Sequence, residues 1–242
     1  MIHAAYIIHL ERAPERAENV QMLVDTIPMS TAVHPAVDGS ALTGGEVAAV
    51  YQSDSHQPHY PFPLTSGEIG CFLSHRSLWA RIVADGLDAA LIIEDDASID
   101  HDPFASALAL AREHIDSLGY IKLPIKNRHT PIHRIEALDG IQLFEQQVIA
   151  LGCHCQMVSR AAAETLLAAT KPFDRPVDVF QQLRHLTGQR IYTIYPNGIS
   201  EISASLGGSN IRRASKPGFL AREFKRFAYR RTVRRLSAKT FP

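Results

Sequence analysis

The sequence predicts an α/β fold with a mostly parallel central sheet flanked by helices. Two observations carry this prediction. Short apolar runs, typical of buried strands, alternate along the chain with longer stretches of helical periodicity. The run at 89–93 reads Ala-Ala-Leu-Ile-Ile without a polar residue, as expected of a central, buried strand. Strands that alternate with helices favour a largely parallel sheet.

The expected elements follow from apolar spacing and from local start and stop residues. Pro14 suits the first turn of a helix, and Gly86 ends the longest helical pattern. We expect strands at 4–10, 89–93, 120–123, 148–158 and 191–195, and helices at 15–26, 66–85, 104–115, 161–170 and 176–186. The segment 28–66, which holds five prolines and the pair Gly44-Gly45, and the polar segment 124–140, with Pro124 and Pro131, are expected to be loops.

Charge divides the chain unevenly. The 25 basic and 25 acidic residues give a formal net charge of zero, yet residues 1–211 carry 14 basic and 24 acidic residues. The segment 212–242 carries 11 basic residues and one acid, Glu223. We therefore expect a globular domain at 1–211 and a basic, partly amphipathic tail at 212–242. The basic residues of the tail are Arg212, Arg213, Lys216, Arg222, Lys225, Arg226, Arg230, Arg231, Arg234, Arg235 and Lys239.

Composition excludes several classes of protein. The apolar fraction of 45% and the charged fraction of 21% are those of a globular protein rather than a disordered one. No apolar run reaches the ~18–20 residues that cross a bilayer. The first ten residues lack a basic segment and a long apolar run, so we expect no signal peptide and a cytoplasmic protein. Three cysteines indicate free thiols.

The acidic triplet Glu94-Asp95-Asp96 follows directly on the buried strand at 89–93. Ligands of open α/β sheets bind beyond the carboxyl ends of strands. On an extended backbone Glu94 and Asp96 point to one side and Asp95 to the other. Two carboxylates on one side suit Mg²⁺ or Mn²⁺, which can hold a diphosphate. The alternative is a solvated acidic turn.

Several blocks of the sequence resemble one known family. Residues 67–96 read GEIGCFLSHRSLWARIVADGLDAALIIEDD, which resembles the central block of glycosyltransferase family 25, the lipooligosaccharide galactosyltransferase-like enzymes. In these enzymes a Gly-Glu-Ile-Gly-Cys-x-x-Ser-His helix precedes an apolar strand and an acidic triplet. Further blocks that are similar to the family lie, in order, at 6–16, 36–39, 152–163, 176–178 and 209–211.

The resemblance implies a GT-A-like nucleotide-sugar-binding fold, a UDP-sugar donor and a divalent metal, Mn²⁺ or Mg²⁺. UDP-galactose is the expected donor. Asp96 and Glu94 are then the expected metal ligands, and Asp95 is expected to face the ribose of the nucleotide. Arg12 and Arg16 are expected to contact the base or diphosphate, and Ser74 and His75 are expected near the donor.

Transfer in this family is expected to invert the anomeric centre, which requires a general base for the acceptor hydroxyl. Asp178, in the Pro-Val-Asp block at the start of a helix, is our candidate. Its alternative role is that of a helix N-terminal acid without chemistry. The expected product is a hexose, galactose in the first instance, joined to a glycan or glycolipid acceptor of the lipooligosaccharide or lipopolysaccharide type.

Two alternative functions remain open. A metal-dependent nucleotidyl or phosphoryl transferase is disfavoured by the lack of a Walker-type glycine-rich loop. A catalytically inactive sugar-nucleotide-binding or membrane-associated scaffold is disfavoured by the intact triplet, because adjacent carboxylates cost stability. The Cys153-His154-Cys155 segment resembles a metal site, but its apolar flanks favour a structural role.

The basic tail predicts association with an anionic membrane, at the inner face of the cytoplasmic membrane. Leu220, Phe224 and Phe227 lie on one face at helical spacing and are expected to insert shallowly, while Tyr229, Val233 and Leu236 fall on the other side. Nucleic acid is not expected as a partner, because the body is acidic and no nucleic-acid-binding module is present. The alternative is a solvated, partly disordered tail.

Overall fold

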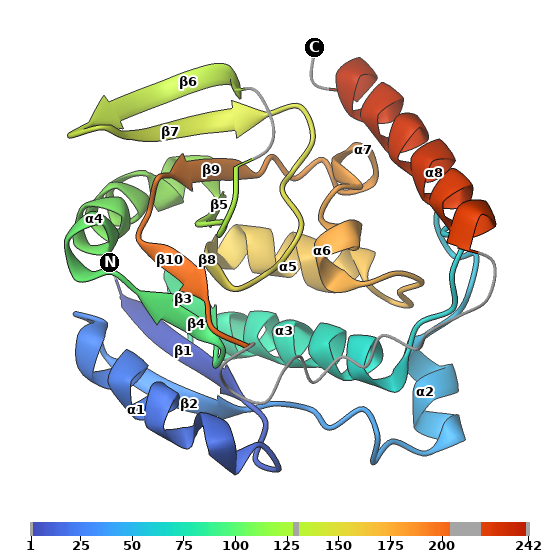
Figure 1. The fold of residues 1–242 in the computed structure, drawn as a ribbon, viewed down its shortest axis with the longest axis horizontal. Helices are drawn as coiled ribbons and strands as arrows, with labels where there is room; N and C mark the ends of the chain where they lie inside the picture. The colour runs from blue at the N-terminus through green and yellow to red at the C-terminus, as the bar shows by residue number, and fades with distance from the viewer. Residues whose placement is uncertain (1, 128–130, 204–218, 241–242) are drawn as a thin grey trace.

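A mixed eight-stranded sheet forms the centre of the protein (Figure 1). The computed structural model describes residues 2–127, 131–203 and 219–240. In spatial order the strands are β2 (Thr31–Pro35), β1 (His3–His9), β3 (Ala89–Glu94), β8 (Cys155–Ser159), β5 (Tyr120–Lys122), β9 (Tyr192–Tyr195), β7 (Ile141–Gln146) and β6 (Pro131–Leu138). Strands β7 and β8 run against the direction shared by the other six. The predicted α/β class is confirmed.

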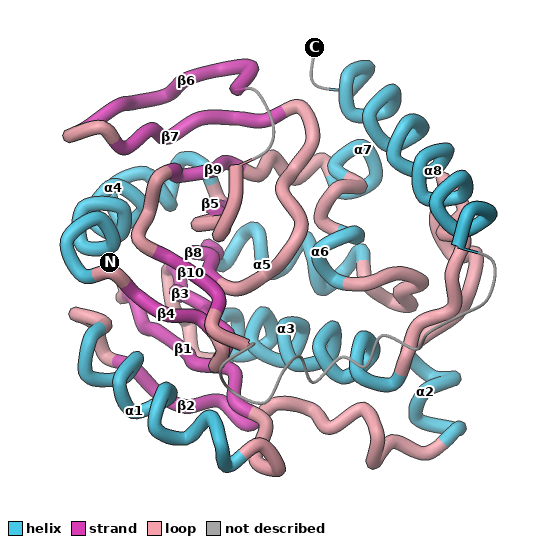
Figure 2. The backbone as a smooth tube through the Cα atoms, in the orientation of Figure 1, coloured by secondary structure: helices cyan, strands magenta, loops and turns pink. Residues whose placement is uncertain are grey.

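Helices cover both faces of the sheet (Figure 2). One apolar core joins the sheet to α1 (Ala17–Thr26) and α4 (His101–Leu118), and a second joins it to α3 (Ser66–Ala84) and α5 (Arg160–Ala169). Along β3, Ala89, Leu91 and Ile93 enter the first core, whereas Ala90 and Ile92 enter the second. The uninterrupted apolar run of this strand is therefore explained by burial on both faces.

Close backbone packing sets the position of α3. Thr65 and Glu68 form a reciprocal capping box that satisfies backbone donors at the helix start. A side chain at Gly70 would meet the Val37 carbonyl oxygen at 2.5 Å, and one at Gly39 would meet the Ser66 carbonyl oxygen at 1.8 Å. The glycines therefore let the 37–39 segment lie directly on the first turns of α3.

The segment expected to be a loop at 28–66 also contains regular structure. It holds the edge strand β2 and the short helix α2 (Gly44–Val50). A capping box between Thr43 and Glu46 begins α2, but none of its residues is fully buried. The weak apolar periodicity that results from this exposure explains why the sequence did not reveal the helix.

Other boundaries differ from prediction in the second half of the chain. The expected loop at 124–140 contains β6, which forms an antiparallel hairpin with β7; its exposed, polar residues hide the strand pattern. The strand expected at 148–158 is the shorter β8, and the helix expected at 176–186 is divided into α6 (Val177–Phe180) and α7 (Arg184–Thr187). A second, two-stranded sheet pairs β4 (Ala97–Ile99) with β10 (Ile199–Glu201).

The basic C-terminal segment forms α8 (Phe219–Thr240), which lies along the outside of the molecule beside α7 (Figure 1). Among its residues 222–240, the buried side chains are Tyr229, Val233 and Ser237. Phe224 and Phe227 are 73% and 62% exposed, so the face that carries them points outward. The helix is thus docked on the body, residues 2–203. The predicted domain boundary at 211/212 and the block at 209–211 lie outside the described residues.

Candidate functional site

The acidic triplet begins at the last residue of β3, and its side chains contact residues on both faces of the sheet. Glu94 hydrogen bonds to His75 of α3, on one face, and Asp95 bonds to Arg16 and Asn19, which belong to the other face. Glu94 and Asp95 therefore face opposite sides of the sheet, as expected, whereas Asp96 lies in the turn after β3 and shares Arg16 with Asp95. This arrangement separates the carboxylates into one that faces α3 and one that ties the strand to the start of α1.

Asp95 is a buried anchor. Its Oδ2 atom lies 2.8 Å from His9 Nδ1 and accepts a hydrogen bond from the backbone N–H of Leu10, while Oδ1 accepts from Arg16. Asn19 donates to the carbonyl oxygens of Asp95 and Ala97 at 2.8 and 2.9 Å. These bonds hold the turn after β3 in one geometry. Contact between Asp95 and a ribose stays a prediction.

Asp96 has one carboxylate oxygen in use and one without a partner. Arg16 donates to Oδ2 at 3.1 Å, but Oδ1 is buried and makes no hydrogen bond among the described residues. Burial and the charge of Glu94 raise the pKa of Asp96, although Arg16 opposes the shift. Two carboxylates that share a space disfavour each other's ionisation. A bound cation would relieve that repulsion and satisfy the buried oxygen.

Glu94 is held in its ionised form. Its Oε1 atom accepts a hydrogen bond from His75 Nε2 at 3.1 Å. Burial acts to raise the pKa of Glu94, but the His75 hydrogen bond and the nearby His154 and Lys122 outweigh it and lower the pKa. The two shifts run in opposite directions, because the pKa of Glu94 is lowered and that of Asp96 is raised.

The structure adds His154 to this group. A ligand atom from each of Glu94, Asp96 and His154 lies within 4.8 Å of the other two. Strand β8 runs antiparallel to β3, and the Glu94 N–H donates to the His154 carbonyl oxygen at 2.9 Å. The start of β8 therefore meets the carboxyl end of β3. The apolar flanks of 153–155 favour a structural role, and the sequence gives no indication of the direction of this strand.

The two cysteines on either side of His154 are buried among apolar residues. Cys153 and Cys155 are 3% and 1% exposed, and they enter different apolar cores. Burial raises the pKa of both thiols well above the usual value. Since a cysteine binds metal as a thiolate, the mixed set of two carboxylates and one imidazole is the better cation site. Its oxygen-rich chemistry fits Mn²⁺ or Mg²⁺.

Three other predicted site residues are engaged within the protein. Ser74 is buried, accepts a hydrogen bond from the Val37 N–H and donates to the Gly70 carbonyl oxygen. Arg12 forms an exposed ion pair with Asp38 at 2.6 Å. Arg16, 3% exposed, holds Asp95 and Asp96. The structure thus brings Arg16, His75 and the triplet together, and nucleotide contacts of Arg12, Arg16 and Ser74 stay predictions.

Asp178 sits at the first turn of α6, half-buried. Its Oδ2 atom accepts a hydrogen bond from the Gly152 N–H at 2.9 Å, and Oδ1 accepts from the Val179 N–H at 2.8 Å. Each carboxylate oxygen has a further lone pair, so both remain able to accept a hydroxyl proton. Through Gly152, whose φ is +87°, Asp178 also holds the segment that leads to His154.

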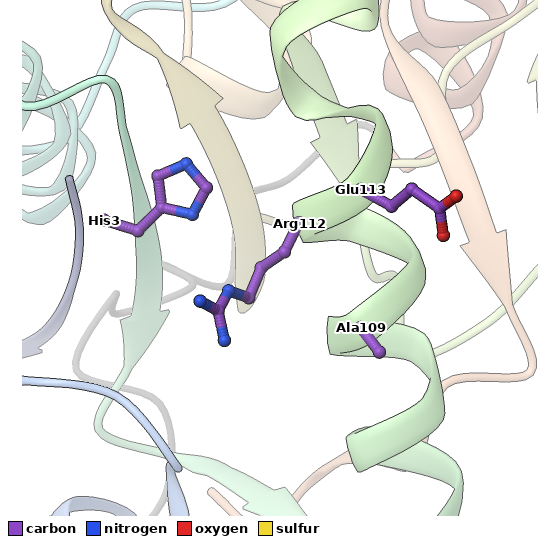
Figure 3. A pocket seen from close by; sticks show the side chains of 4 residues that line it. All are labelled: His3, Ala109, Arg112 and Glu113. Atoms are coloured by element: carbon purple, nitrogen blue, oxygen red, sulfur yellow. The ribbon is translucent and has the colours of Figure 1, made fainter. Parts of the chain in front are cut away.

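A surface hollow elsewhere in the molecule has a different lining. In Figure 3, His3 and Arg112 extend toward the same space, while Glu113 lies on the far side of α4. None of the predicted site residues lines this hollow.

Across residues 2–127, 131–203 and 219–240, the helices do not combine the length and apolar character that a bilayer crossing requires.

Comparison with solved structures gives a distant similarity. A Drosophila beta-1,4-galactosyltransferase 7 mutant, in complex with manganese, UDP-Gal and xylobiose, is similar over 93% of this chain and 80% of its own. The sequence identity is 12% and the TM-score is 0.46.

Comparison with curated proteins gives nearer relatives. A glycosyltransferase 25 family member from Drosophila melanogaster is 31% identical over 74% of this chain and 30% of its own length. Procollagen galactosyltransferase 1 from Danio rerio is 37% identical over 38% of this chain and 16% of its own. The inactive glycosyltransferase 25 family member 3 from Mus musculus is 29% identical over 82% of this chain and 35% of its own.

The chain therefore spans about a third or less of the length of these relatives. The family model described as "Glycosyltransferase family 25 (LPS biosynthesis protein)" matches residues 2–181. That match includes β1, α3, the acidic triplet and His154, the parts of the chain that build the site. The chain belongs to glycosyltransferase family 25.

Proposed function

We propose that this protein is a metal-dependent, inverting glycosyltransferase with a GT-A-like donor site. It moves a hexose, galactose from UDP-galactose, to a glycan acceptor of the lipooligosaccharide or lipopolysaccharide type. The observation that carries the proposal is the unpartnered, buried Asp96 Oδ1 beside an ionised Glu94, at the carboxyl end of a central strand. Family membership and relatives named as galactosyltransferases support the donor.

The site residues divide the work of donor binding. Asp96 and Glu94 would hold Mn²⁺ or Mg²⁺, which supplies positive charge to the diphosphate of the donor and to the departing UDP. Arg16 and Asn19 fix the backbone and carboxylates of the triplet, so that little reorganisation accompanies binding. Asp95 completes this frame.

Asp178 is the proposed general base. In an inverting displacement the acceptor hydroxyl attacks the anomeric carbon, its proton passes to an Asp178 oxygen, and the sugar–phosphate bond breaks as UDP leaves. The two backbone donors orient the carboxylate without using all of its lone pairs. Removal of a general base costs about 10²–10⁴ in rate.

An inactive binding protein is the second candidate function. It is favoured by a relative that is named inactive and that matches 82% of this chain. Against it stands the Glu94–Asp96 repulsion, which raises the pKa of Asp96 in the cation-free protein. A protein without catalytic use for these carboxylates would gain stability by losing one of them.

We further propose that α8 holds the protein at an anionic membrane, the inner face of the cytoplasmic membrane, where a glycolipid acceptor is presented. The exposed basic side chains of α8 flank Phe224 and Phe227, which point away from the body. Each basic group near such a surface contributes about 1 kcal/mol. The aromatic side chains can enter the headgroup region.

The test of the enzyme is a transfer assay with purified protein, Mn²⁺, UDP-galactose and truncated lipooligosaccharide. We expect UDP release coupled to transfer, and a β-linked product from an α-linked donor in proton NMR. Asp96→Ala is expected to abolish transfer, and Asp178→Asn to lower kcat about 10²–10⁴-fold with unchanged Mn²⁺ affinity. Asp102→Asn, at a side chain 97% exposed, is the control.

The outcomes separate the proposals. No transfer and no UDP release with any UDP-sugar would favour the inactive binding protein. Activity that survives Asp96→Ala would contradict the metal assignment. If Asp178→Asn weakens Mn²⁺ binding, Asp178 acts through Gly152 on the His154 segment and is not the base.

A further inference from the structure

We propose that His154 is the nitrogen ligand of the cation site and that His75 is a positioning residue, which fixes Glu94 without touching the cation. The inference rests on the proposed metal-dependent function and assigns separate roles to two histidines beside one carboxylate. Its basis is the division of Glu94 between them: Oε1 faces His75 at 3.1 Å, whereas Oε2 faces His154 at 4.0 Å.

The His154 ring is placed and available for coordination. Its Nε2 atom lies 4.0 Å from Glu94 Oε2, and within the described residues the ring makes no hydrogen bond. A cation about 2.1 Å from each ligand holds two ligand atoms no more than about 4.2 Å apart. The Glu94–His154 separation is inside this limit, and Asp96 supplies the third atom of the group.

The backbone holds the His154 side chain at this place. The Glu94 N–H bonds to the His154 carbonyl oxygen, and Asp178 fixes Gly152 two residues earlier. His154 is 21% exposed at its side chain, as is Glu94 at 22%, so both reach the edge of the site that a donor would approach. A cation held there would be able to take diphosphate oxygens as further ligands.

Both ring nitrogens of His75 already have hydrogen-bond partners. Its side chain is fully buried, and Gln156 Nε2 lies 2.9 Å from Nδ1. Because Gln156 donates to Nδ1, the ring proton is on Nε2 and donates to Glu94. Neither ring nitrogen is left for a cation. Cys71 is also near Glu94, but its Sγ atom lies 3.9 Å from Oε1, the oxygen that His75 holds.

A buried chain of hydrogen bonds sets the orientation of Gln156. Tyr120 donates to Gln156 Oε1 at 2.6 Å, so the amide nitrogen faces His75. Gln181 donates in turn to the Tyr120 hydroxyl, and Lys122 donates to Gln181 Oε1 at 2.9 Å. The chain therefore fixes the tautomer of His75, and His75 keeps Glu94 Oε1 turned away from the cation.

The test is pulsed electron paramagnetic resonance on the full chain with Mn²⁺ alone, in frozen solution. We expect a nitrogen coupling to the bound Mn²⁺ that changes to the ¹⁵N pattern when histidine is ¹⁵N-labelled. His154→Ala is expected to abolish the coupling and to weaken Mn²⁺ binding at least 10-fold. His101→Ala, at a side chain 73% exposed, is the matched control.

A second variant tests the positioning role. Gln156→Met keeps the side-chain length but no longer donates to His75, so it is expected to retain the nitrogen coupling while Mn²⁺ affinity falls about 10–100-fold. The His75 Nδ1 resonance in ¹⁵N NMR is expected to shift in this variant and to stay unchanged in His154→Ala. Thermal unfolding verifies that each variant is folded.

Each outcome has a defined consequence. A coupling that survives His154→Ala, or one that Gln156→Met abolishes, would overturn the assignment of the two histidines. Mn²⁺ that binds without nitrogen coupling would overturn the inference alone and leave the carboxylate site intact. Absence of Mn²⁺ binding to the wild-type chain would contradict the metal-dependent function as well.

Discussion

Two regions of the molecule concentrate charge of one sign, and the fold treats them in opposite ways. The acidic triplet at the end of β3 is buried and fixed by partners: Asp95 is 5% exposed, and Arg16 binds both Asp95 and Asp96. The basic residues of α8 are largely exposed. In the described part of that helix they form one ion pair, between Arg226 and Glu223.

The difference indicates two uses of charge. Carboxylates that must present a fixed geometry to a ligand need partners and burial, because a low local dielectric strengthens each interaction. Basic groups that attract an extended surface need no fixed geometry and act best when solvated and unpaired. A chain with zero net charge therefore carries one buried, fixed acidic cluster and one exposed basic surface.

The largest expected effect on stability is at Arg16. Replacement by methionine leaves Asp95 and Asp96 buried without their shared cation, so Arg16→Met is expected to lower the free energy of unfolding by about 3–5 kcal/mol. Urea unfolding followed by circular dichroism measures the change. Arg12→Met is the matched control: its pair with Asp38 is exposed and screened by water, so its loss should lower the free energy of unfolding far less. Equal losses in both variants would contradict the contrast between buried and exposed charge.

A smaller effect is expected where the body meets α8. Arg175, fully buried, donates to the Tyr229 hydroxyl of α8 at 2.8 Å and to both carboxylate oxygens of Asp174. Burial acts to raise the pKa of Asp174, but hydrogen bonds from Arg175 and His56 outweigh it and lower the pKa. Asp174→Asn is therefore expected to cost about 3 kcal/mol at neutral pH, because the Arg175 charge loses its partner.

The sign of the pH dependence follows from the lowered pKa. The ionised form of Asp174 is favoured in the folded state, so its contribution is present above the ordinary carboxyl pKa of about 3.9 and is lost as the pH falls below it. The difference in unfolding free energy between wild type and Asp174→Asn should shrink from pH 7 to pH 3. A difference that stays constant over this range would contradict the ionised pair. Asp102→Asn serves as the exposed control.

The sequence predicted what depends on local chemistry. The uninterrupted apolar run of β3, the triplet behind it and the opposite sides of Glu94 and Asp95 follow from strand periodicity alone. The direction of β8 depends instead on which strand it pairs with, and that direction brings His154 to Glu94. A histidine between two buried cysteines gives no local indication of this neighbour.

The same limit applies to α8: its sequence does not indicate which of its faces packs on the body. Helical spacing separated Phe224 and Phe227 from Tyr229 and Val233, but spacing does not say which face meets the body. Tyr229 and Val233 are buried because the Tyr229 hydroxyl satisfies Arg175 and its ring packs edge-on against Tyr60. Phe224 and Phe227, on the opposite face, are exposed to solvent and accessible to a binding partner.

The smallest expected effects are at single basic residues of α8, and they separate membrane attraction from packing. Arg230→Gln and Arg234→Gln change exposed side chains and should each weaken binding to anionic vesicles by about 1 kcal/mol, roughly fivefold, with no effect on stability. Binding should weaken further with salt, because solvated charges are screened. Vesicle sedimentation measures both.

Point changes test the helix better than its removal, because a chain without α8 would leave the buried Arg175 without Tyr229. Arg112→Gln, at an exposed arginine of α4 on the other side of the molecule (Figure 1), is the charge control and should leave sedimentation unchanged. Phe224→Ser should weaken binding, whereas Leu138→Ser, at an exposed apolar position of β6, should not. If Arg112→Gln and Arg230→Gln weaken sedimentation equally, the attraction belongs to overall charge rather than to the outer face of α8.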